Sequence, residues 1–580
     1  MRYDNSDEEL VRFIKDPVAN VDVLLKRLTQ TKPFVRLLFR FPLFRKLLPV
    51  EAARALLYEH IYSVYCVAVS ELRNNAPTCV PFNQDTYQNL KILSDVFDIH
   101  FKESIPDYAK KAVVAFIEKH KAAKVEYHCN RVMEVYPMSG QGAFPLRNFL
   151  NVWRLFFLSE TLFLIETGQM SVNTHRSGFV VKRNEKMLTE TSAYWIAETS
   201  ESTSNIADKI MLSLNKQPGE MPRAISAQQL MSYVAFVMDK VFSIQADYLP
   251  SDIRRTESYR LFWDAIAFAI LVDLFCLNHF GSIEKYEIHR RRLIREENLE
   301  FIDSILSSLD SLRFGDATGF VSADADRYHR GRLNFKYGIK KFVGVILHNF
   351  KEKTNESFFG LYGKSFESDF ILRKIREFGG AIYTVFEGFN PRSHKSLVKN
   401  YDIDVIIHNR SKDKFYFIQV KYFASFIPTY LSEQCAFMND RRFKRGIRQL
   451  LGLKGRLNEK SIRQILENKG LAGATNENSH FLLVHNIPFL NFYEHEGVIL
   501  YEWNLLRNLL SGGSWTQFSE DNIEEGCMNI DFDFEDPLDC ATRYIKGGMM
   551  KGAYEASFAF FLNSRSVLKF DNFDVTSDML

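Results

Sequence analysis

The sequence lacks several features that would place it in a class of protein at once. Its seven cysteines form no CxxC pair and no cluster with histidine, so neither a zinc site nor a disulfide framework is indicated. There is no GxxxxGK[ST] loop, so any ATP dependence would come from a partner. The formal net charge is only +3 over 580 residues, so a nucleic-acid surface would have to be a local patch. Scattered free thiols fit a reducing compartment, and we expect a cytoplasmic protein.

A long hydrophobic run without charge is also missing. The most apolar stretch, 261–281, contains Asp264 and Asp273 inside it and His279 near its end. Because acids are costly within lipid, we expect a buried helix rather than a membrane span, and we expect no membrane partner. Residues 1–10 are charged and mostly acidic, unlike a signal peptide.

The sequence does show a change of character near residue 355. Before it, apolar residues recur at intervals of three and four, which predicts helices at 50–72, 108–128, 146–166 and 227–245. We therefore expect a mostly α-helical region over 1–350, in one or two subdomains, with a recognition or regulatory role. An α/β domain over 355–512 follows, and 513–580 forms an acidic tail with an apolar docking segment.

One early stretch, 26–48, is basic. It carries seven Lys and Arg and no acid, interleaved with Phe and Leu. A nucleic-acid contact or a helix on a membrane surface would use such a segment. The simpler interpretation is an amphipathic helix with a solvated basic side, interrupted by Pro33 and Pro42.

The α/β domain has a readable order of elements. A helix over 363–380 ends at two glycines, and a strand over 381–389 follows. Two β-type runs, 403–407 and 415–421, are joined by a polar turn at 409–414. A helix over 440–457, strands over 481–487 and 497–503, and a helix over 504–511 complete the domain.

Three polar residues stand on the two central strands. Side chains alternate along a strand, so Gln419 and Lys421 share one face, and Asp404 lies on the neighbouring strand. An acid, an amide oxygen and an ammonium could together build a metal-assisted site for phosphodiester cleavage. Mg²⁺ prefers oxygen ligands and is held by one or two carboxylates plus substrate phosphate.

This pattern resembles the PD-(D/E)xK nuclease superfamily, and most closely its Mrr-like restriction-endonuclease branch, where the acid-x-Lys motif is often Gln-x-Lys, as in Gln419-Val420-Lys421. The resemblance covers about a quarter of the chain. It implies a restriction-endonuclease-like α/β core with a mixed central sheet, and Mg²⁺-dependent cleavage of DNA, with Mn²⁺ as a substitute, in restriction or defence against foreign DNA. It also implies a main-chain ligand at Val420 and an acid on the first helix of the domain, a position that Glu367 matches.

The expected roles follow from these residues. Asp404, Gln419, the Val420 carbonyl and Glu367 would hold the metal, and Lys421 would orient the attacking water and offset charge. The helix over 440–457 would contact the phosphate backbone through a basic face made of Arg441, Arg442, Lys444, Arg445 and Arg448. A homodimer or a partner protein is expected beside DNA.

Other interpretations of the same residues stay open. Asp404 can be a strand-end acid, Gln419 a core amide and Lys421 a surface cation. The fold can bind nucleic acid or act as a scaffold after losing catalysis, because its acids are few. RNA is the alternative substrate on the same scaffold.

Overall fold

The computed structural model describes part of the chain. The described residues are 9, 12–13, 20–30, 32–74, 98–100, 154–155, 158–159, 161–163, 165–166, 170–175, 178–183, 225–276, 281–309, 320–330, 335–350, 358–379, 383–389, 402–423, 440–487, 493–511, 514–518, 523–527, 565–570 and 573–576. The expected helix at 108–128 lies outside them. Of the expected helix at 146–166, only short fragments between residues 154 and 166 are described, and their residues are helical.

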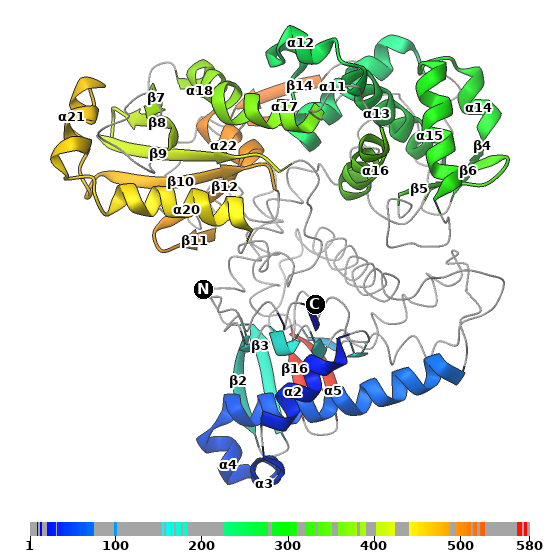
Figure 1. Ribbon diagram of the computed structural model, residues 1–580, viewed down its shortest axis with the longest axis vertical. Coiled ribbons are helices and arrows are strands. Elements are labelled where there is room, and N and C mark those ends of the chain that lie inside the picture. Colours follow the sequence, from blue (N-terminus) through cyan, green and yellow to red (C-terminus); the bar gives the residue numbers. More distant parts are fainter. Residues whose placement is uncertain are drawn as a thin grey trace, which may run out of the picture.

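A six-stranded mixed sheet is the centre of the α/β part (Figure 1). Its order is β11 (Tyr493–His495), β12 (Val498–Glu502), β10 (Ser479–His485), β9 (Lys414–Lys421), β8 (Ile403–Asn409) and β7 (Tyr383–Phe389). Strands β9, β10 and β12 run parallel, while β7, β8 and β9 form an antiparallel meander. The mixed sheet that the sequence predicts is therefore present.

The turn between β8 and β9 explains why these two strands pair in one register. Asn409 Oδ1 accepts hydrogen bonds from the backbone N–H groups of Ser411 and Lys412, at 3.1 and 3.3 Å. Asp413 adopts a left-handed φ of 48°, which short polar residues tolerate better than others. This turn pairs Val405 with Ile418 and so sets Asp404 beside Gln419 one position further along.

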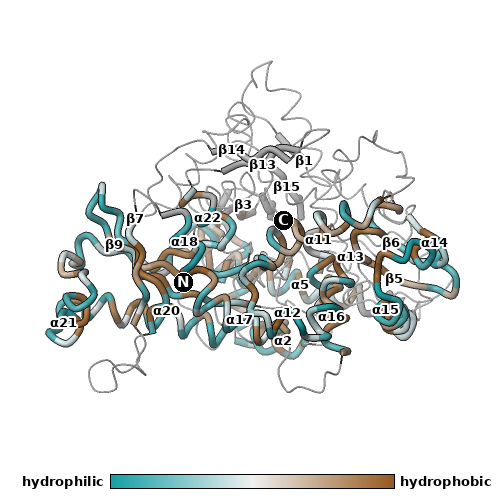
Figure 2. Tube along the Cα trace, turned by 90° about the horizontal axis from the view of Figure 1, so that it is seen from above, coloured by the Kyte–Doolittle hydropathy of each residue, from teal (hydrophilic) through white to brown (hydrophobic). Residues whose placement is uncertain are grey.

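One face of the sheet is covered by α20 (Arg441–Lys454) and α21 (Lys460–Asn468), of which the sequence predicted only the first. Asp440 caps α20 by accepting from the N–H groups of Arg442 and Phe443 at 2.8 and 3.2 Å. The buried side chains of α20 pack on Phe417 and Leu483 of the sheet. In Figure 2 hydrophobic residues run through the strands, while α20 alternates between hydrophobic and hydrophilic residues.

The other face carries α17 (Phe358–Ser365), η5 (Phe366–Phe370), α18 (Ile371–Gly379) and α22 (Trp503–Leu510). The sequence predicted one regular helix over 363–380. Instead the helical run begins at Phe358, and its five residues 366–370 form a π-helical turn. Such turns insert one extra residue and occur frequently at functional sites. This turn carries Glu367.

The helices that precede residue 350 share a hydrophobic core with the central sheet. Its elements include α11 (Ala227–Phe242), η3 (Ala246–Tyr248), α12 (Ser251–Arg254), α13 (Glu257–Cys276), α14 (Lys285–Arg290), α15 (Glu296–Ser308) and α16 (Phe335–Asn349). One cluster of buried residues runs from these helices to the sheet face under α17, η5, α18 and α22. Arg507 of α22 forms an ion pair with Asp239 of α11 at 2.7 Å. The expected boundary near 350–355 stays a prediction, and the buried core is continuous across it.

Helix α13 confirms the expectation of a buried apolar helix. Its Asp264 is buried but accepts hydrogen bonds from Arg295 at 2.8 Å and from Asn298 at 2.7 Å. An acid in this apolar helix is therefore compensated by neighbours rather than by water. Among the described residues, no helix combines the length and the apolar character that crossing a membrane requires.

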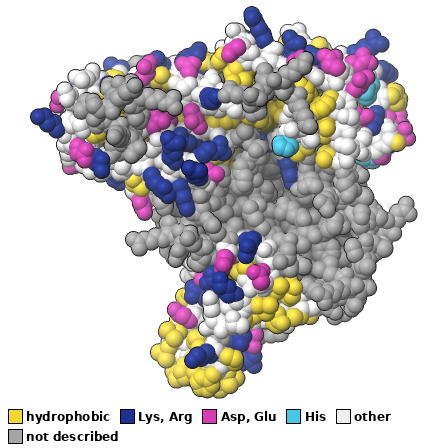
Figure 3. Space-filling model, in the orientation of Figure 1, with side chains coloured by type: hydrophobic (Ala, Val, Ile, Leu, Met, Phe, Trp, Pro, Cys, Tyr) yellow, Lys and Arg dark blue, Asp and Glu magenta, His cyan; other side chains and the backbone are white. Residues whose placement is uncertain are grey.

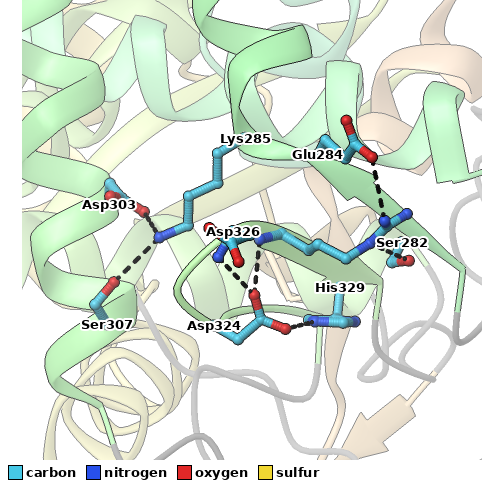
Figure 4. Close-up of polar contacts among 9 residues, drawn as sticks. Ser282, Glu284, Lys285, Asp303, Ser307, Asp324, Asp326 and His329 are labelled. Atoms are coloured by element: carbon cyan, nitrogen blue, oxygen red, sulfur yellow. Dashed lines mark hydrogen bonds and ion pairs between the residues drawn. The ribbon is translucent and has the colours of Figure 1, made fainter.

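A small sheet of β4 (Ser282–Glu284), β6 (Arg327–Arg330) and β5 (Val321–Ala323) closes this part. Figure 4 shows its polar network: Lys285 reaches Asp303 of α15 at 2.7 Å, and Asp324 accepts from His329 at 2.6 Å and from the N–H of Arg327 at 2.7 Å. The Asp324 bonds close the β5–β6 turn, and Lys285 connects this turn to α15, because its backbone N–H donates to the Asp326 carbonyl oxygen at 2.8 Å while its ammonium pairs with Asp303.

The N-terminal residues form a group of helices, α2 (Val21–Gln30), α3 (Pro33–Leu38), α4 (Pro42–Leu47) and α5 (Pro49–Asn74). A five-stranded sheet joins them, in the order β1 (Asp98–His100), β15 (Arg565–Phe570), β16 (Phe573–Thr576), β3 (Gly178–Arg183) and β2 (Met170–His175). Residues 565–576, expected as part of an acidic tail, thus pair with strands from the first third of the chain. Residues 514–518 and 523–527 form the hairpin β13–β14. The expected docking segment at 554–564 lies outside the described residues.

Candidate active site

The site begins with the contact between Asp404 and the end of β9. Asp404 Oδ2 accepts hydrogen bonds from Gln419 Nε2 and from the backbone N–H of Val420, both at 2.6 Å. Because both bonds end on Oδ2, Oδ1 is the oxygen left for another partner. The structure thus brings the predicted acid and the predicted amide together across two adjacent strands.

The environment of Asp404 opposes its ionisation. The pKa of this carboxyl is raised to about 8, chiefly by burial and to a smaller extent by the charges of Asp402 and Glu367. The Lys421 cation and the Val420 N–H lower the pKa but do not overcome burial. A carboxyl held in this state releases a proton when a cation binds to it, so metal binding at Asp404 would depend on pH.

Lys421 and Glu367 meet beside Asp404. Lys421 Nζ lies 2.9 Å from the Val420 carbonyl oxygen and 3.7 Å from Glu367 Oε2. Glu367 Oε1 accepts from the backbone N–H of Tyr422 at 3.1 Å. The π-helical turn lies on the opposite face of the sheet from α20, so Glu367 reaches the site around the end of β9. The acid that the resemblance places on the first helix is therefore at the site.

Gln419 provides the clearest sign of a missing ligand. Its side chain is 0% exposed, and its Oε1 has no hydrogen-bond partner in the described part of the chain. A buried amide oxygen without a partner costs free energy of about 1–3 kcal/mol, so native proteins rarely keep one without reason. A half-turn about the Cγ–Cδ bond of Gln419 would exchange the positions of Oε1 and Nε2. The amide oxygen would then take the place beside Asp404 that Nε2 occupies now.

The donor set fits Mg²⁺. Asp404 and Glu367 supply two carboxylates and Gln419 an amide oxygen, which agrees with a cation that keeps several waters and takes few protein ligands. The Val420 carbonyl oxygen already accepts a hydrogen bond from Lys421, so only its second lone pair could bind the cation. Within the described residues no three His, Cys, Asp or Glu side chains gather as a ready metal site, so the amide oxygen would be essential.

The predicted basic face of α20 lies next to the site. Arg441, Arg442, Arg445 and Arg448 are exposed, and Lys444 is half-buried. Arg442 also stacks on the Phe423 ring, with its guanidinium carbon 4.6 Å from the ring centroid. Figure 3 shows Lys and Arg side chains gathered where Figure 1 places α20. These cations form one continuous surface beside the end of β9.

Two glycines that shape the site were missed in the sequence. Gly446 of α20 faces β9: a Cβ there would lie 2.8 Å from Leu483 Cδ1, 3.5 Å from Gln419 Cγ and 3.6 Å from Lys421 Cε. Gly388 of β7 lies beside Asp404, and a Cβ there would lie 1.6 Å from the Ile403 carbonyl oxygen. A glycine within a predicted helix or strand was the available signal, because it marks a close approach of backbone or side chains.

The other acids near the site have different partners. Glu387 of β7 is exposed and lies 3.4 Å from Arg376 of α18, which makes it a surface ion pair. Asp402 is half-buried at the start of β8 and acts on Asp404 through its charge. The structure thus selects Asp404 and Glu367 from the acids that the sequence offers.

No protein-family model matches this chain. Neither the curated proteins nor the solved structures contain a significant match to it. The likeness to PD-(D/E)xK nucleases therefore rests on the motif residues and on the order of elements around them.

Proposed function

We propose that this protein is a Mg²⁺-dependent endonuclease that hydrolyses phosphodiester bonds in DNA, on a restriction-endonuclease-like fold. The observation that carries the proposal is the buried, unpartnered Oε1 of Gln419 beside Asp404 and Lys421. Gln449 Oε1 is also buried without a partner, so it is the position of Gln419 against Asp404 that favours a metal ligand over a core amide. The Mn²⁺ ion would substitute, since it takes the same oxygen ligands.

Each residue has a chemical role in this proposal. Asp404, Gln419 and Glu367 would hold the cation, which supplies charge stabilisation to the phosphate and lowers the pKa of a bound water. Lys421 would orient the attacking water and offset the charge of the scissile phosphate. Its contacts with the Val420 carbonyl and Glu367 fix the ammonium before substrate arrives. The exposed arginines of α20 would bind the phosphate backbone.

The test is cleavage of supercoiled plasmid with Mg²⁺ or Mn²⁺, comparing the wild-type chain with Asp404→Ala and Lys421→Ala. Asp413→Asn is the matched control, because this exposed acid lies at the opposite end of the β8–β9 hairpin. We expect nicking or linearisation by the wild type and the control alone. Equal cutting by all four proteins would place the activity elsewhere or in a contaminant.

A binding-only function is the competing proposal. It is favoured by one observation: Lys421 already satisfies both the Val420 carbonyl and Glu367, as a purely structural cation would. In that case no variant cuts, and salt-sensitive DNA binding survives Lys421→Ala. An RNase would instead cut a single-stranded RNA under the same conditions with the same residue requirements. A role in restriction or defence is proposed from the family resemblance alone.

A further inference from the structure

A second surface of the molecule is unlike the rest. Six large apolar side chains on α3, α4 and the adjoining turns are between 49% and 67% exposed. They are Phe34, Leu37, Phe41, Leu43, Leu47 and Leu48, and we call them the α3–α4 apolar surface. Figure 3 shows them as the hydrophobic patch at the end of the molecule where Figure 1 places α3 and α4. Contiguous patches of this kind mark interaction sites in folded proteins.

The fold itself keeps these side chains outside. The simpler interpretation of the sequence was an amphipathic helix with a solvated basic side, interrupted by Pro33 and Pro42. In the structure these two prolines start two separate helices of six residues each. Helix α3 buries none of its own residues, and α4 buries only Arg45. The chain thus anchors α4 through a cation and turns its apolar residues to solvent, which is the reverse of a normal core-facing helix.

The surface is held in place from behind. The Arg45 guanidinium lies 5.8 Å from the centroid of the Phe179 ring on β3. Arg40, in the turn between α3 and α4, forms an ion pair with Glu59 of α5 at 2.9 Å. Phe39 is buried beneath the same turn. These contacts support the two helices, so the exposed apolar groups are presented by a defined structure.

Cations predominate around the surface: residues 32–48 include five Lys and Arg and no acid, and Glu51 of α5 is the next acid along the chain. The chain contains no Asp or Glu between residues 23 and 50. Lys32 and Lys46 are exposed and Arg36 is half-exposed, while the other two cations of the α3–α4 segment face Glu59 and Phe179. A matching partner therefore offers an apolar phase for the aliphatic and aromatic side chains and negative charge for the cations that flank them.

We propose that the α3–α4 apolar surface docks in the plane of an anionic lipid bilayer. Leu and Phe side chains enter the acyl boundary while Lys32, Arg36 and Lys46 remain at the level of the headgroups. Nucleic acid carries the negative charge but has no aliphatic environment in which the four leucines could be buried, so a lipid surface is the better match. This proposal departs from the expectation of no membrane partner. That expectation came from the acids within 261–281, which argue against a membrane span and do not bear on a surface that lies on one leaflet.

The test is flotation of the full chain with vesicles of phosphatidylcholine alone or of equimolar phosphatidylcholine and phosphatidylglycerol. We expect the wild type to float with the anionic vesicles only. Phe41→Ser, Leu43→Ser and Leu47→Ser together should lower the bound fraction at least about tenfold. Met231→Ser with Tyr286→Ser is the matched control, because these side chains are 59% and 58% exposed elsewhere.

A second variant tests the contribution of the cations and guards against a serine variant that simply misfolds. Lys32→Gln, Arg36→Gln and Lys46→Gln leave the apolar groups intact and should also weaken flotation about tenfold or more. Retention of lipid binding by both variants would overturn the proposal. So would equal flotation with neutral vesicles, or a loss of DNA binding in the serine variant with lipid binding unchanged.

Discussion

Glu367 Oε2 lies 3.7 Å from Lys421 Nζ although Glu367 comes from a turn that packs on one face of the central sheet and Lys421 ends a strand within that sheet. Glu367 comes from a π-helical turn, and its Oε1 also accepts from the Tyr422 N–H at 3.1 Å. One side chain therefore fixes both the backbone and the ammonium at the end of β9. The extra residue of the π turn directs this acid to the strand end.

Glu367→Gln tests the role of this acid. Glutamine keeps an oxygen acceptor for Tyr422, so the fold should be retained, but it removes the charge that faces Lys421 and the cation. We expect plasmid cleavage to fall about 10- to 100-fold, as for other residues that orient a metal site. Asp369→Asn on the same turn is the control, because Asp369 pairs with Arg373 at the surface. Equal losses in both variants would indicate damage to the turn.

The raised pKa of Asp404 predicts that the proposed Mg²⁺ binding depends on pH. Since burial raises this pKa to about 8, binding of the cation below that pH must displace a proton. We expect the apparent affinity to rise about tenfold per pH unit up to about pH 7 and to level off above about pH 8. Calorimetry in two buffers with different ionisation heats should show about one proton released at low pH and none at high pH. Binding without proton release at low pH would contradict the assignment of Asp404.

The same carboxyl affects the stability of the metal-free protein. Its pKa is about 8 when folded and 3.8 ordinarily, so between these values the folded chain holds a proton that the unfolded chain has lost. The unfolding free energy therefore decreases as pH rises through this window. Asp404→Asn removes the titration, and we expect it to be more stable than wild type by on the order of 5 kcal/mol near pH 8, with the gap closing towards pH 4.

Urea denaturation with chelator present measures this difference. Asp413→Asn serves as the control, because Asp413 is exposed and its only described side-chain contact is with His408 at 3.0 Å. It should track the wild type at every pH. A stability gap for Asp404→Asn that is equal at low and high pH would mean that packing, not titration, causes it.

Local pattern was enough to find the centre of the site. The alternation of Ile403 to Ile407 and of Phe415 to Lys421, with a polar turn between, determines a hairpin that places Asp404 beside Gln419. The cap residue Asp440 and the basic and apolar faces of α20 were equally local features. These elements could be predicted because their determinants lie within a few residues of each other.

What the sequence could not reveal depends on contacts distant in the chain. The buried residues of the π turn, Phe366 and Phe370, are four positions apart, a spacing that an α-helix also produces, so Glu367 could be matched to the helix but not to the geometry of the turn. The pairing of β16 with β3 joins positions almost four hundred residues apart, as Val575 with Val181. Likewise, Leu43 and Leu47 are exposed because no element of the described part of the chain covers them, which periodicity cannot show.

Gly388→Ala tests whether the strand next to Asp404 tolerates any side chain. A Cβ at this position would lie 1.6 Å from the Ile403 carbonyl oxygen and 2.8 Å from the Asp404 carbonyl carbon, so β7 must move away from β8. Because both obstacles are backbone atoms, we expect a loss of about 1–3 kcal/mol in unfolding free energy together with weaker Mg²⁺ binding. Gly455→Ala is the matched control, since its Cβ would meet nothing closer than the Leu451 carbonyl oxygen at 3.6 Å. Wild-type stability and wild-type Mg²⁺ binding in Gly388→Ala would show that the β7–β8 pairing does not position Asp404.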